Sequence, residues 1–289
     1  MKSQIKLFIE LTRLNKPIGI MLLFWPCSWG LAYAYNYTKN LDQFLLYLIL
    51  FFLGSVLMRS AGCIINDVVD KDYDKKVKRT KQRPIAANLV SVNQALIYSA
   101  LLCLVAFFIL IQFNKLTIIL GLSSMLLAFT YPFMKRITYW PQLFLGITFN
   151  YGLILGWTAV YGKIDFIPLI FYIGAIFWTL GYDTIYGYQD IKDDEIIGLK
   201  STSIKFKNKA KQFLITCYLV LILILIIIGY MMSFSKYYYF FLIIPFIHLF
   251  IYQIKIFDHN SPENCLKAFK SNNLFGLIVL FNILIGKFI

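Results

Sequence analysis

Two short segments of the 289-residue chain hold nine of its fourteen acidic residues. In the first segment, Asn66, Asp67, Asp70 and Asp74 would lie within about 100° of one another on a helix, because successive helical residues turn by ~100°. Such a face carries only oxygen donors, and its carboxylates repel one another unless a cation lies between them. A solvated loop face is the alternative interpretation of one acidic cluster.

The second acidic segment repeats this pattern. Asp183, Asp190 and Asp194 are spaced at i, i+7 and i+11, which on a helix would align three carboxylates on one stripe. Two facing stripes would form a cage for hard divalent cations. Because neither cluster contains a His or Cys, the donor set favours Mg²⁺, which completes its coordination shell with water and substrate phosphates. The two clusters together therefore indicate a phosphate-bearing substrate.

Basic residues follow both acidic clusters. A basic run at positions 78–83 comes after the first cluster, and Lys200 comes after the second. Guanidinium forks and ammonium groups suit the diphosphate oxygens that a metal leaves uncovered. Tyr131 and Lys135 add a hydroxyl and an ammonium at a third position of the same kind. Ordinary charged or aromatic anchors at a membrane surface are the alternative interpretation of these residues.

Arg59 is the one basic residue inside a long apolar run. It precedes Asn66 by seven residues, which places it about 10 Å deeper on the same helix stripe. A charge at such a depth requires an anion. No other apolar run carries an acid at that depth except Asp183, so structural partners for Arg59 are scarce. The sequence therefore favours a substrate carboxylate over a structural ion pair as the partner of Arg59.

The composition identifies the elements that must position these residues. Hydrophobic residues make up 60% of the chain and charged residues only 15%, which is too little charge to cover a water-exposed surface. The net charge of +14 is dispersed between apolar runs, and this distribution argues against nucleic acid as a partner. The five cysteines and two histidines lack the spacing of zinc, haem or disulfide frameworks. The chain is therefore predicted to be a membrane protein.

Apolar runs long enough to cross a bilayer occur nine times. The sequence thus predicts an all-α polytopic membrane protein with nine transmembrane helices in a single domain over residues 1–289. The predicted spans are Ile18 to Tyr35, Phe44 to Ile65, Gln94 to Phe113, Leu116 to Phe133, Trp140 to Tyr161, Phe166 to Tyr186, Phe213 to Met232, Tyr237 to Ile254 and Leu274 to Ile289.

Basic residues are unevenly divided between the alternate connections of these spans. One side holds 22 of the 28 Lys and Arg residues and the other holds five, with Arg59 inside a span. Positive residues are retained in the cytoplasm, so the N-terminus is predicted to be cytoplasmic and the C-terminus to lie outside. The two long cytoplasmic connections, residues 66–93 and 187–212, are predicted to be functional loops because they carry both acidic clusters.

With these residues in view, the chain resembles the UbiA superfamily of intramembrane prenyltransferases over nearly its whole length. The matching motifs are Arg13 to Gly19 with Trp25-Pro26, Arg59 to Asp67 continued by Asp70 and Asp74, Lys78-Arg79-Thr80 with Arg83-Pro84, Tyr131-Pro132 with Lys135-Arg136, Tyr182-Asp183-Thr184, Asp190 with Asp193-Asp194 and Gly198, and Lys200-Ser201-Thr202. Some members place an acid at the position of Gly187. Here the second motif is shifted to Asp190 and Asp194, which favours the branch that prenylates hydroxybenzoate.

The resemblance implies a UbiA-type nine-helix bundle with cytoplasmic cap loops, in which two Mg²⁺ ions bridge the acidic motifs and a polyprenyl diphosphate. It implies transfer of the prenyl group to the carbon ortho to the hydroxyl of 4-hydroxybenzoate, a step of ubiquinone biosynthesis in a cell inner membrane. The implied metal ligands are Asn66, Asp67, Asp70, Asp74, Asp190 and Asp194. The implied substrate contacts are Arg59, Lys78, Arg79, Arg83, Tyr131, Lys135, Tyr186 and Lys200, and the implied catalytic residues are Asp183, Arg59, Asp70 and Asp190.

Other functions remain open at this stage. A UbiA-type enzyme could instead prenylate protohaem, dihydroxynaphthoate or a tetrapyrrole alcohol, although Arg59 and the Tyr182-Asp183-Thr184 pattern argue against these acceptors. A cation or metabolite transporter also uses acids within a membrane, but near its midplane. Here the acids gather at one membrane face beside basic segments. A purely structural membrane protein has no use for two costly acidic stripes.

Overall fold

The computed structural model describes residues 3–35 and 40–288, and this part of the chain is helical with no strand. Lys2, Lys39 and Ile289, which enter the charge count and the last predicted span, lie outside the described residues. The helices that cross the bundle are α2 (Ile18–Ala34), α3 (Leu41–Val69), α5 (Val92–Leu110), α6 (Lys115–Thr130), α8 (Pro141–Tyr161), α9 (Phe166–Gly187), α12 (Ala210–Met231) and α16 (Pro262–Phe288).

Short elements complete the fold. One further crossing is made by α13 (Lys236–Phe241), α14 (Ile243–Phe246), the π-helix η3 (Ile247–Gln253) and α15 (Ile254–Ile256), which follow one another with almost no break. The remaining short helices are α1 (Gln4–Thr12), α4 (Lys71–Asp74), η1 (Tyr131–Phe133), α7 (Met134–Ile137), α10 (Ile191–Ile196), α11 (Thr202–Lys205) and η2 (Lys207–Lys209).

The lengths of these helices fit a multi-pass membrane protein. Within the described residues, eight helical segments are long and apolar enough to cross a bilayer. The ninth, α2, has 17 apolar residues and spans about 26 Å at ~1.5 Å per residue, close to the ~30 Å hydrocarbon core. The predicted all-α architecture is confirmed, and the nine predicted spans agree with these eight segments and α2.

Small residues bring α2 and α8 into close contact at the centre of the bundle. A Cβ atom added to Gly30 of α2 would clash with the carbonyl oxygen of Leu153, and one added to Gly156 of α8 would clash with the carbonyl oxygen of Cys27. Glycine at both positions therefore lets the two backbones touch. Close backbone approach is how helices gain packing energy in a lipid environment, where the hydrophobic effect does not drive their association.

Hydrogen bonds from buried indoles tie α2, α9 and α16 together. The Trp29 indole donates to the Gly276 carbonyl over 2.9 Å, and the Trp178 indole donates to Asn272 Oδ1 over 2.8 Å. Both indoles are fully buried. A polar group left without a partner in the membrane interior is costly, so these bonds fix the relative positions of the three helices.

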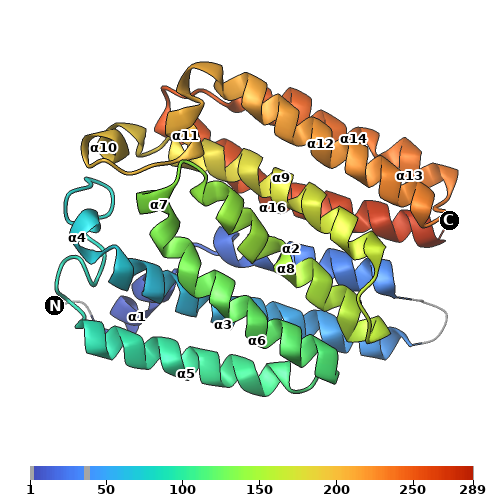
Figure 1. Ribbon diagram of the computed structural model, residues 1–289, viewed down its shortest axis with the longest axis horizontal. Helices are drawn as coiled ribbons and strands as arrows, with labels where there is room; N and C mark the ends of the chain where they lie inside the picture. Colours follow the sequence, from blue (N-terminus) through green and yellow to red (C-terminus); the bar gives the residue numbers. More distant parts are fainter. Residues whose placement is uncertain (1–2, 36–39, 289) are drawn as a thin grey trace.

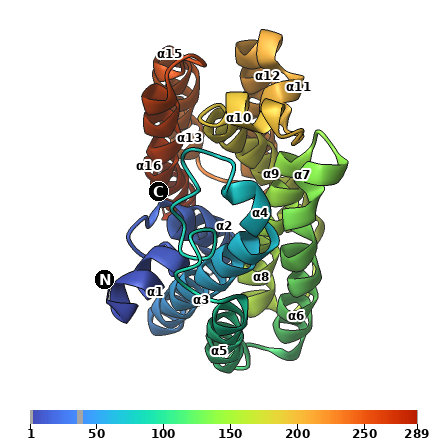
Figure 2. The ribbon, with the colours of Figure 1, turned by 90° about the vertical axis from the view of Figure 1, so that its left-hand side faces the viewer.

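The two ends of the bundle differ. The N-terminus lies at one end together with α4, α7, α10 and α11, whereas the C-terminus lies at the opposite end (Figure 1). A view onto the first end shows these short helices grouped over the ends of the long ones (Figure 2). The basic and acidic connections predicted to form a cap thus share one face of the molecule.

The cap differs from the prediction in its local structure. Residues 66–93 and 187–212 are not loops throughout, because α3 continues to Val69 and short helices fill much of both segments. The expectation of two continuous acidic stripes was wrong. Helix α3 ends before Asp70, and α9 ends at Gly187, so Asp190 caps a separate helix, α10. The acids therefore converge through chain turns.

Candidate active site

A cavity of about 990 Å³ opens under the cap. We call residues 66–93 and 187–212 the first and second cap segments. The cavity receives side chains from both cap segments, from the connection between α1 and α2, and from α3, α8, α9 and α16. Every predicted site residue lines it except Asp70 and Lys78. The predicted residues on its wall are Arg59, Asn66, Asp67, Asp74, Arg79, Arg83, Tyr131, Lys135, Asp183, Tyr186, Asp190, Asp194 and Lys200.

Two acids of the first cluster are held by arginines. Arg13 NH2 donates to both oxygens of Asp67 over 2.7 Å, and Arg83 NH1 donates to Asp67 Oδ1 over 3.1 Å and to Asp74 Oδ2 over 2.8 Å. Asp67 and Asp74 are only 2% and 5% exposed. Their charges therefore fasten the end of α1 and the first cap segment to α3.

Asp70 is buried at the junction between α3 and α4 and is paired from another direction. Lys135 of α7 donates to its Oδ2, and Arg136 donates to Oδ1 over 3.4 Å. Arg136 also donates to the Val69 carbonyl over 2.6 Å, which satisfies an unpaired carbonyl at the end of α3. Because Lys135 reaches the cavity wall, Asp70 lies one side chain behind it.

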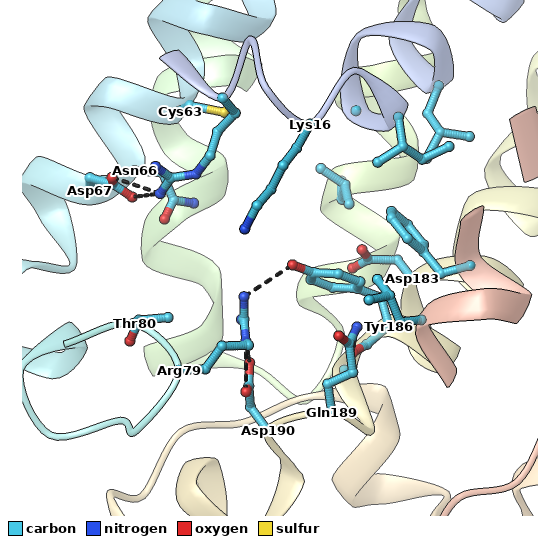
Figure 3. A pocket seen from close by; sticks show the side chains of 18 of the residues that line it. Lys16, Cys63, Asn66, Asp67, Arg79, Thr80, Asp183, Tyr186, Gln189 and Asp190 are labelled. Carbon is cyan, nitrogen blue, oxygen red and sulfur yellow. Dashed lines mark hydrogen bonds and ion pairs between the residues drawn. The ribbon is translucent and has the colours of Figure 1, made fainter. Parts of the chain in front are cut away.

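The second cap segment is joined to the first through Arg79. Its guanidinium donates to both oxygens of Asp190 and, over 3.3 Å, to the Tyr186 hydroxyl, while lying 5.6 Å from the centre of the Tyr186 ring. Figure 3 shows these three side chains meeting in the cavity, with the Lys16 side chain extending toward them. Lys78, by contrast, is exposed, and its backbone amide donates to Asp193 over 3.2 Å. Both contacts bring the acidic segments together.

The oxygen donors on this wall fit magnesium in kind. Asn66, Asp190 and Asp194 supply amide and carboxylate oxygens from both cap segments, which are the ligands that Mg²⁺ prefers. Burial, together with the negative charge of Asp190, raises the pKa of Asp194 to about 6, against the opposing effects of Lys135 and Arg79. A divalent cation beside Asp194 would stabilise its charged form against both effects. Within the part of the chain that the structure describes, Asp190 pairs with Arg79, Asp70 pairs with Lys135, and no three acids cluster as a ready metal-binding group.

Arg59 and Asp183 face the deeper part of the cavity without an ion pair. None of the described carboxylates lies within 4.0 Å of the Arg59 guanidinium, and the Arg59 Nε is buried with no hydrogen-bond partner. The charges of Arg59 and Asp183 nevertheless attract each other. The cavity therefore holds an arginine and a carboxylate that form no ion pair with any described residue.

Aromatic rings form the wall beside these two residues. Tyr131, Tyr182 and Tyr186 line the cavity, and Phe269 of α16 packs against Tyr186 with ring centres 4.5 Å apart. Ring faces are electron-rich and attract cations. Lys200 completes the rim, where its ammonium donates to the Ile137 carbonyl over 3.2 Å.

Sequence reasoning assigned no role to several cavity residues. Arg13 and Lys16 belong to a motif that signalled family resemblance only, and Phe149 and Phe269 are indistinguishable in sequence from the other phenylalanines of the spans. The pairing of Arg13 with Asp67 could have been suspected from two charges near the ends of neighbouring spans.

Comparison with known proteins agrees with this geometry. The model of the UbiA prenyltransferase family matches residues 23–279. The chain belongs to the UbiA prenyltransferase family. Among its relatives, the mitochondrial 4-hydroxybenzoate polyprenyltransferase of Bos taurus is 45% identical over 281 residues, which cover 97% of this chain and 75% of the relative.

Solved structures of UbiA homologues share the fold. The apo structure of a homologue from Aeropyrum pernix K1 has a TM-score of 0.77 at 22% identity, covering 92% of this chain and 97% of that one. A homologue from Archaeoglobus fulgidus, solved bound to GPP and Mg²⁺, has a TM-score of 0.70 at 18% identity, with 97% and 98% covered. At these identities the likeness concerns the fold.

Proposed function

We propose that this chain is a Mg²⁺-dependent 4-hydroxybenzoate polyprenyltransferase, an enzyme of ubiquinone biosynthesis. It transfers a polyprenyl group from polyprenyl diphosphate to the ring carbon ortho to the hydroxyl. The observation that carries this proposal is one cavity in which oxygen donors and cations lie under the cap while an unpaired Arg59 and Asp183 lie deeper. Membership of the UbiA family and the name of the Bos taurus relative support the reaction.

The oxygen donors of the two cap segments would hold the metal. We assign Asn66, Asp190 and Asp194, which line the cavity, as residues that would bind two Mg²⁺ ions together with the diphosphate. Asp70 would join them once Lys135, which pairs with it at the cavity wall, binds the diphosphate instead. Asp67 and Asp74, the two other predicted ligands, are held by Arg13 and Arg83, so their part is to support the metal-binding segment. When bound, Mg²⁺ supplies positive charge that stabilises the leaving diphosphate.

Basic residues of the cap would bind the diphosphate oxygens. Arg79, Arg83, Lys135 and Lys200 line the cavity, and Lys78 lies outside it. When the allylic carbon–oxygen bond breaks, its electron pair leaves with the diphosphate. Fixed cations near that oxygen stabilise the developing charge.

The deeper residues would bind and activate the aromatic acid. Arg59 pairs with the carboxylate, and Asp183 accepts the phenolic proton, which raises the electron density on the ortho carbon. That carbon donates an electron pair to the allylic carbon, forming the new carbon–carbon bond, and the ring proton then leaves to water. Tyr131 and Tyr186 face the allylic cation and shield it from solvent.

Two competing functions are less well supported. An acceptor whose reacting group has no carboxylate beside it, such as the vinyl group of protohaem or a tetrapyrrole alcohol, leaves Arg59 without a partner at the reacting centre. A transporter requires acids near the membrane midplane. Here α4, which contains Asp74, and α10, which follows Asp190, lie at the capped end of the bundle (Figure 2).

We further propose that the chain resides in a cell inner membrane with its capped end and N-terminus in the cytoplasm and its C-terminus outside. The uneven division of basic residues supports this orientation. A membrane-impermeant thiol reagent applied to intact cells should label Lys163→Cys and leave Lys71→Cys unlabelled; the reverse pattern would invert the topology.

A direct assay tests the function. The purified chain in liposomes is supplied with ring-labelled 4-hydroxybenzoate, a series of prenyl diphosphates and either Mg²⁺ or EDTA, with dihydroxynaphthoate and protohaem as competing acceptors. We expect a prenylated hydroxybenzoate, formed only with Mg²⁺, and diphosphate in equal amount. Product from a competing acceptor alone, or none from any, would overturn the proposal. The Arg59→Gln variant should require far more 4-hydroxybenzoate for the same rate.

A further inference from the structure

Arg59 is held in place by contacts that use none of its hydrogen-bond donors. Its guanidinium packs against the backbone of Gly19, at the start of α2. A Cβ atom added to Gly19 would lie 2.5 Å from Arg59 Nε, 3.1 Å from NH2 and 3.2 Å from Cζ. Since distances under about 3.0 Å are not tolerated, the absent side chain of Gly19 is the space that Arg59 occupies.

A third helix covers another side of the same guanidinium. Arg59 Cζ lies 5.3 Å from the centre of the Phe149 ring of α8, a cation–π distance. Helices α2, α3 and α8 thus converge on this one group. Neither contact involves an acceptor atom, so neither satisfies an N–H group of Arg59, consistent with the unpartnered Nε.

We propose that Gly19 and Phe149 are positioning residues that set the orientation of Arg59 and thereby the affinity of the site for a carboxylate-bearing acceptor. This inference rests on the proposed function, because Arg59 is there the group that binds the acid. Gly19 supplies room and Phe149 supplies an electron-rich face, and together they hold a flexible side chain in one orientation before the acceptor arrives. Such preorganisation lowers the entropic cost of binding.

The Gly19→Ala variant separates this role from a purely structural one. The atoms that the added methyl meets belong to the movable end of Arg59, so the guanidinium shifts while the helices stay in place. Gly62→Ala is the matched control, because the same change on α3, three residues from Arg59, would meet nothing within 4 Å. Phe149→Leu is the second variant, and Phe144→Leu, on the same helix but away from the cavity wall, is its control.

The test measures steady-state kinetics and the binding of 4-hydroxybenzoate by calorimetry in nanodiscs. We expect Gly19→Ala and Phe149→Leu to raise KM and Kd for 4-hydroxybenzoate by at least ~10-fold, the scale of a lost charged hydrogen bond. KM for the prenyl diphosphate should change by less than ~2-fold, because the cap residues are untouched. Both controls should match the wild type.

An Arg59→Ala background makes the test decisive. If Gly19 acts only through Arg59, adding Gly19→Ala to Arg59→Ala should leave KM for the acid where Arg59→Ala alone puts it. A further rise in that background, an equal rise in both KM values, or wild-type values in both single variants would overturn the inference. If Gly19→Ala and Phe149→Leu weaken binding of the acid as expected but the wild-type chain does not prenylate it, the proposed function alone would be refuted.

Discussion

Asp67 and Asp194 line the same cavity, yet they should respond to neutralisation in opposite ways. Asp67 is 2% exposed and accepts three hydrogen bonds, two from Arg13 and one from Arg83. Asp67→Asn keeps the size of the side chain and removes the charge that both guanidinium groups require. We predict that this variant is less stable than the wild type but binds metal with nearly the same affinity.

The size of the effect follows from the exposure of the partners. Removing one member of a buried ion pair costs ~3–5 kcal/mol. The lower value applies here, because Arg13 and Arg83 are 20% and 21% exposed and can recover some hydration. With ~2 °C per kcal/mol for a chain of this size, Asp67→Asn should lower the melting temperature by about 6 °C.

A thiol-reactive dye in detergent measures this melting temperature, since four of the five cysteines are buried and react on unfolding. The Mg²⁺ concentration that gives half-maximal activity is measured on the same samples. Asp67→Asn should leave that concentration within ~2-fold of wild type, the scale of an indirect effect. Asp194→Asn should raise it by at least ~10-fold, because a ligand that must be anionic is lost.

The opposite assignment has a clear signature. If Asp67→Asn has the melting temperature of the wild type but requires much more Mg²⁺ for half-maximal activity, then Asp67 is a metal ligand and its pairing with Arg13 and Arg83 is incidental. The reasoning from burial and hydrogen bonding would then be wrong for the whole first cluster.

Three further outcomes are expected. In EDTA, Asp194→Asn should raise the melting temperature more at pH 7.5 than at pH 5. In the wild type, the pKa of the Asp194 carboxyl is about 6 in the folded state, above its value in the unfolded chain, so the folded protein loses stability as the pH rises through 6. An equal rise in melting temperature at both pH values would contradict this. Asp183→Asn should lower kcat at least ~100-fold, as loss of a proton acceptor does; unchanged kcat would exclude it. Gly30→Ala should lower the free energy of unfolding by ~1–3 kcal/mol, because the added methyl clashes with the backbone of Leu153. Gly54→Ala, whose added methyl meets nothing within 4 Å, should keep the melting temperature of the wild type.

The fold follows from the sequence more completely than the site does. Hydropathy alone indicates the spans, because a bilayer requires ~20 apolar residues per helix whatever their neighbours. The division of basic residues places both acidic segments on one face, and the structure puts α4 and α10 at one end of the bundle (Figure 1). The spacing of Asp183, Asp190 and Asp194, however, suggested one stripe of a helix, whereas α9 ends at Gly187 and a separate helix, α10, begins after Asp190.

Long-range pairing accounts for the rest. Arg13 and Asp67 are 54 residues apart. Their places near the ends of neighbouring spans put them at the same face, but which of the clustered acids Arg13 pairs with depends on helix packing. The same holds for Gly19 and Phe149, which reach Arg59 from separate helices. Residue type predicted which side chains belong to the site, but their division into supporting and ligand-facing groups depends on packing between helices.

Manganese binding tests the central claim most directly, namely that acids of both cap segments hold divalent metal together with a prenyl diphosphate. Mn²⁺ replaces Mg²⁺, and electron paramagnetic resonance counts the ions bound to the chain in the presence of a non-reactive prenyl thiodiphosphate. We expect two ions per wild-type chain and a loss of binding in both Asp70→Asn and Asp190→Asn. Undiminished binding in these variants would contradict it.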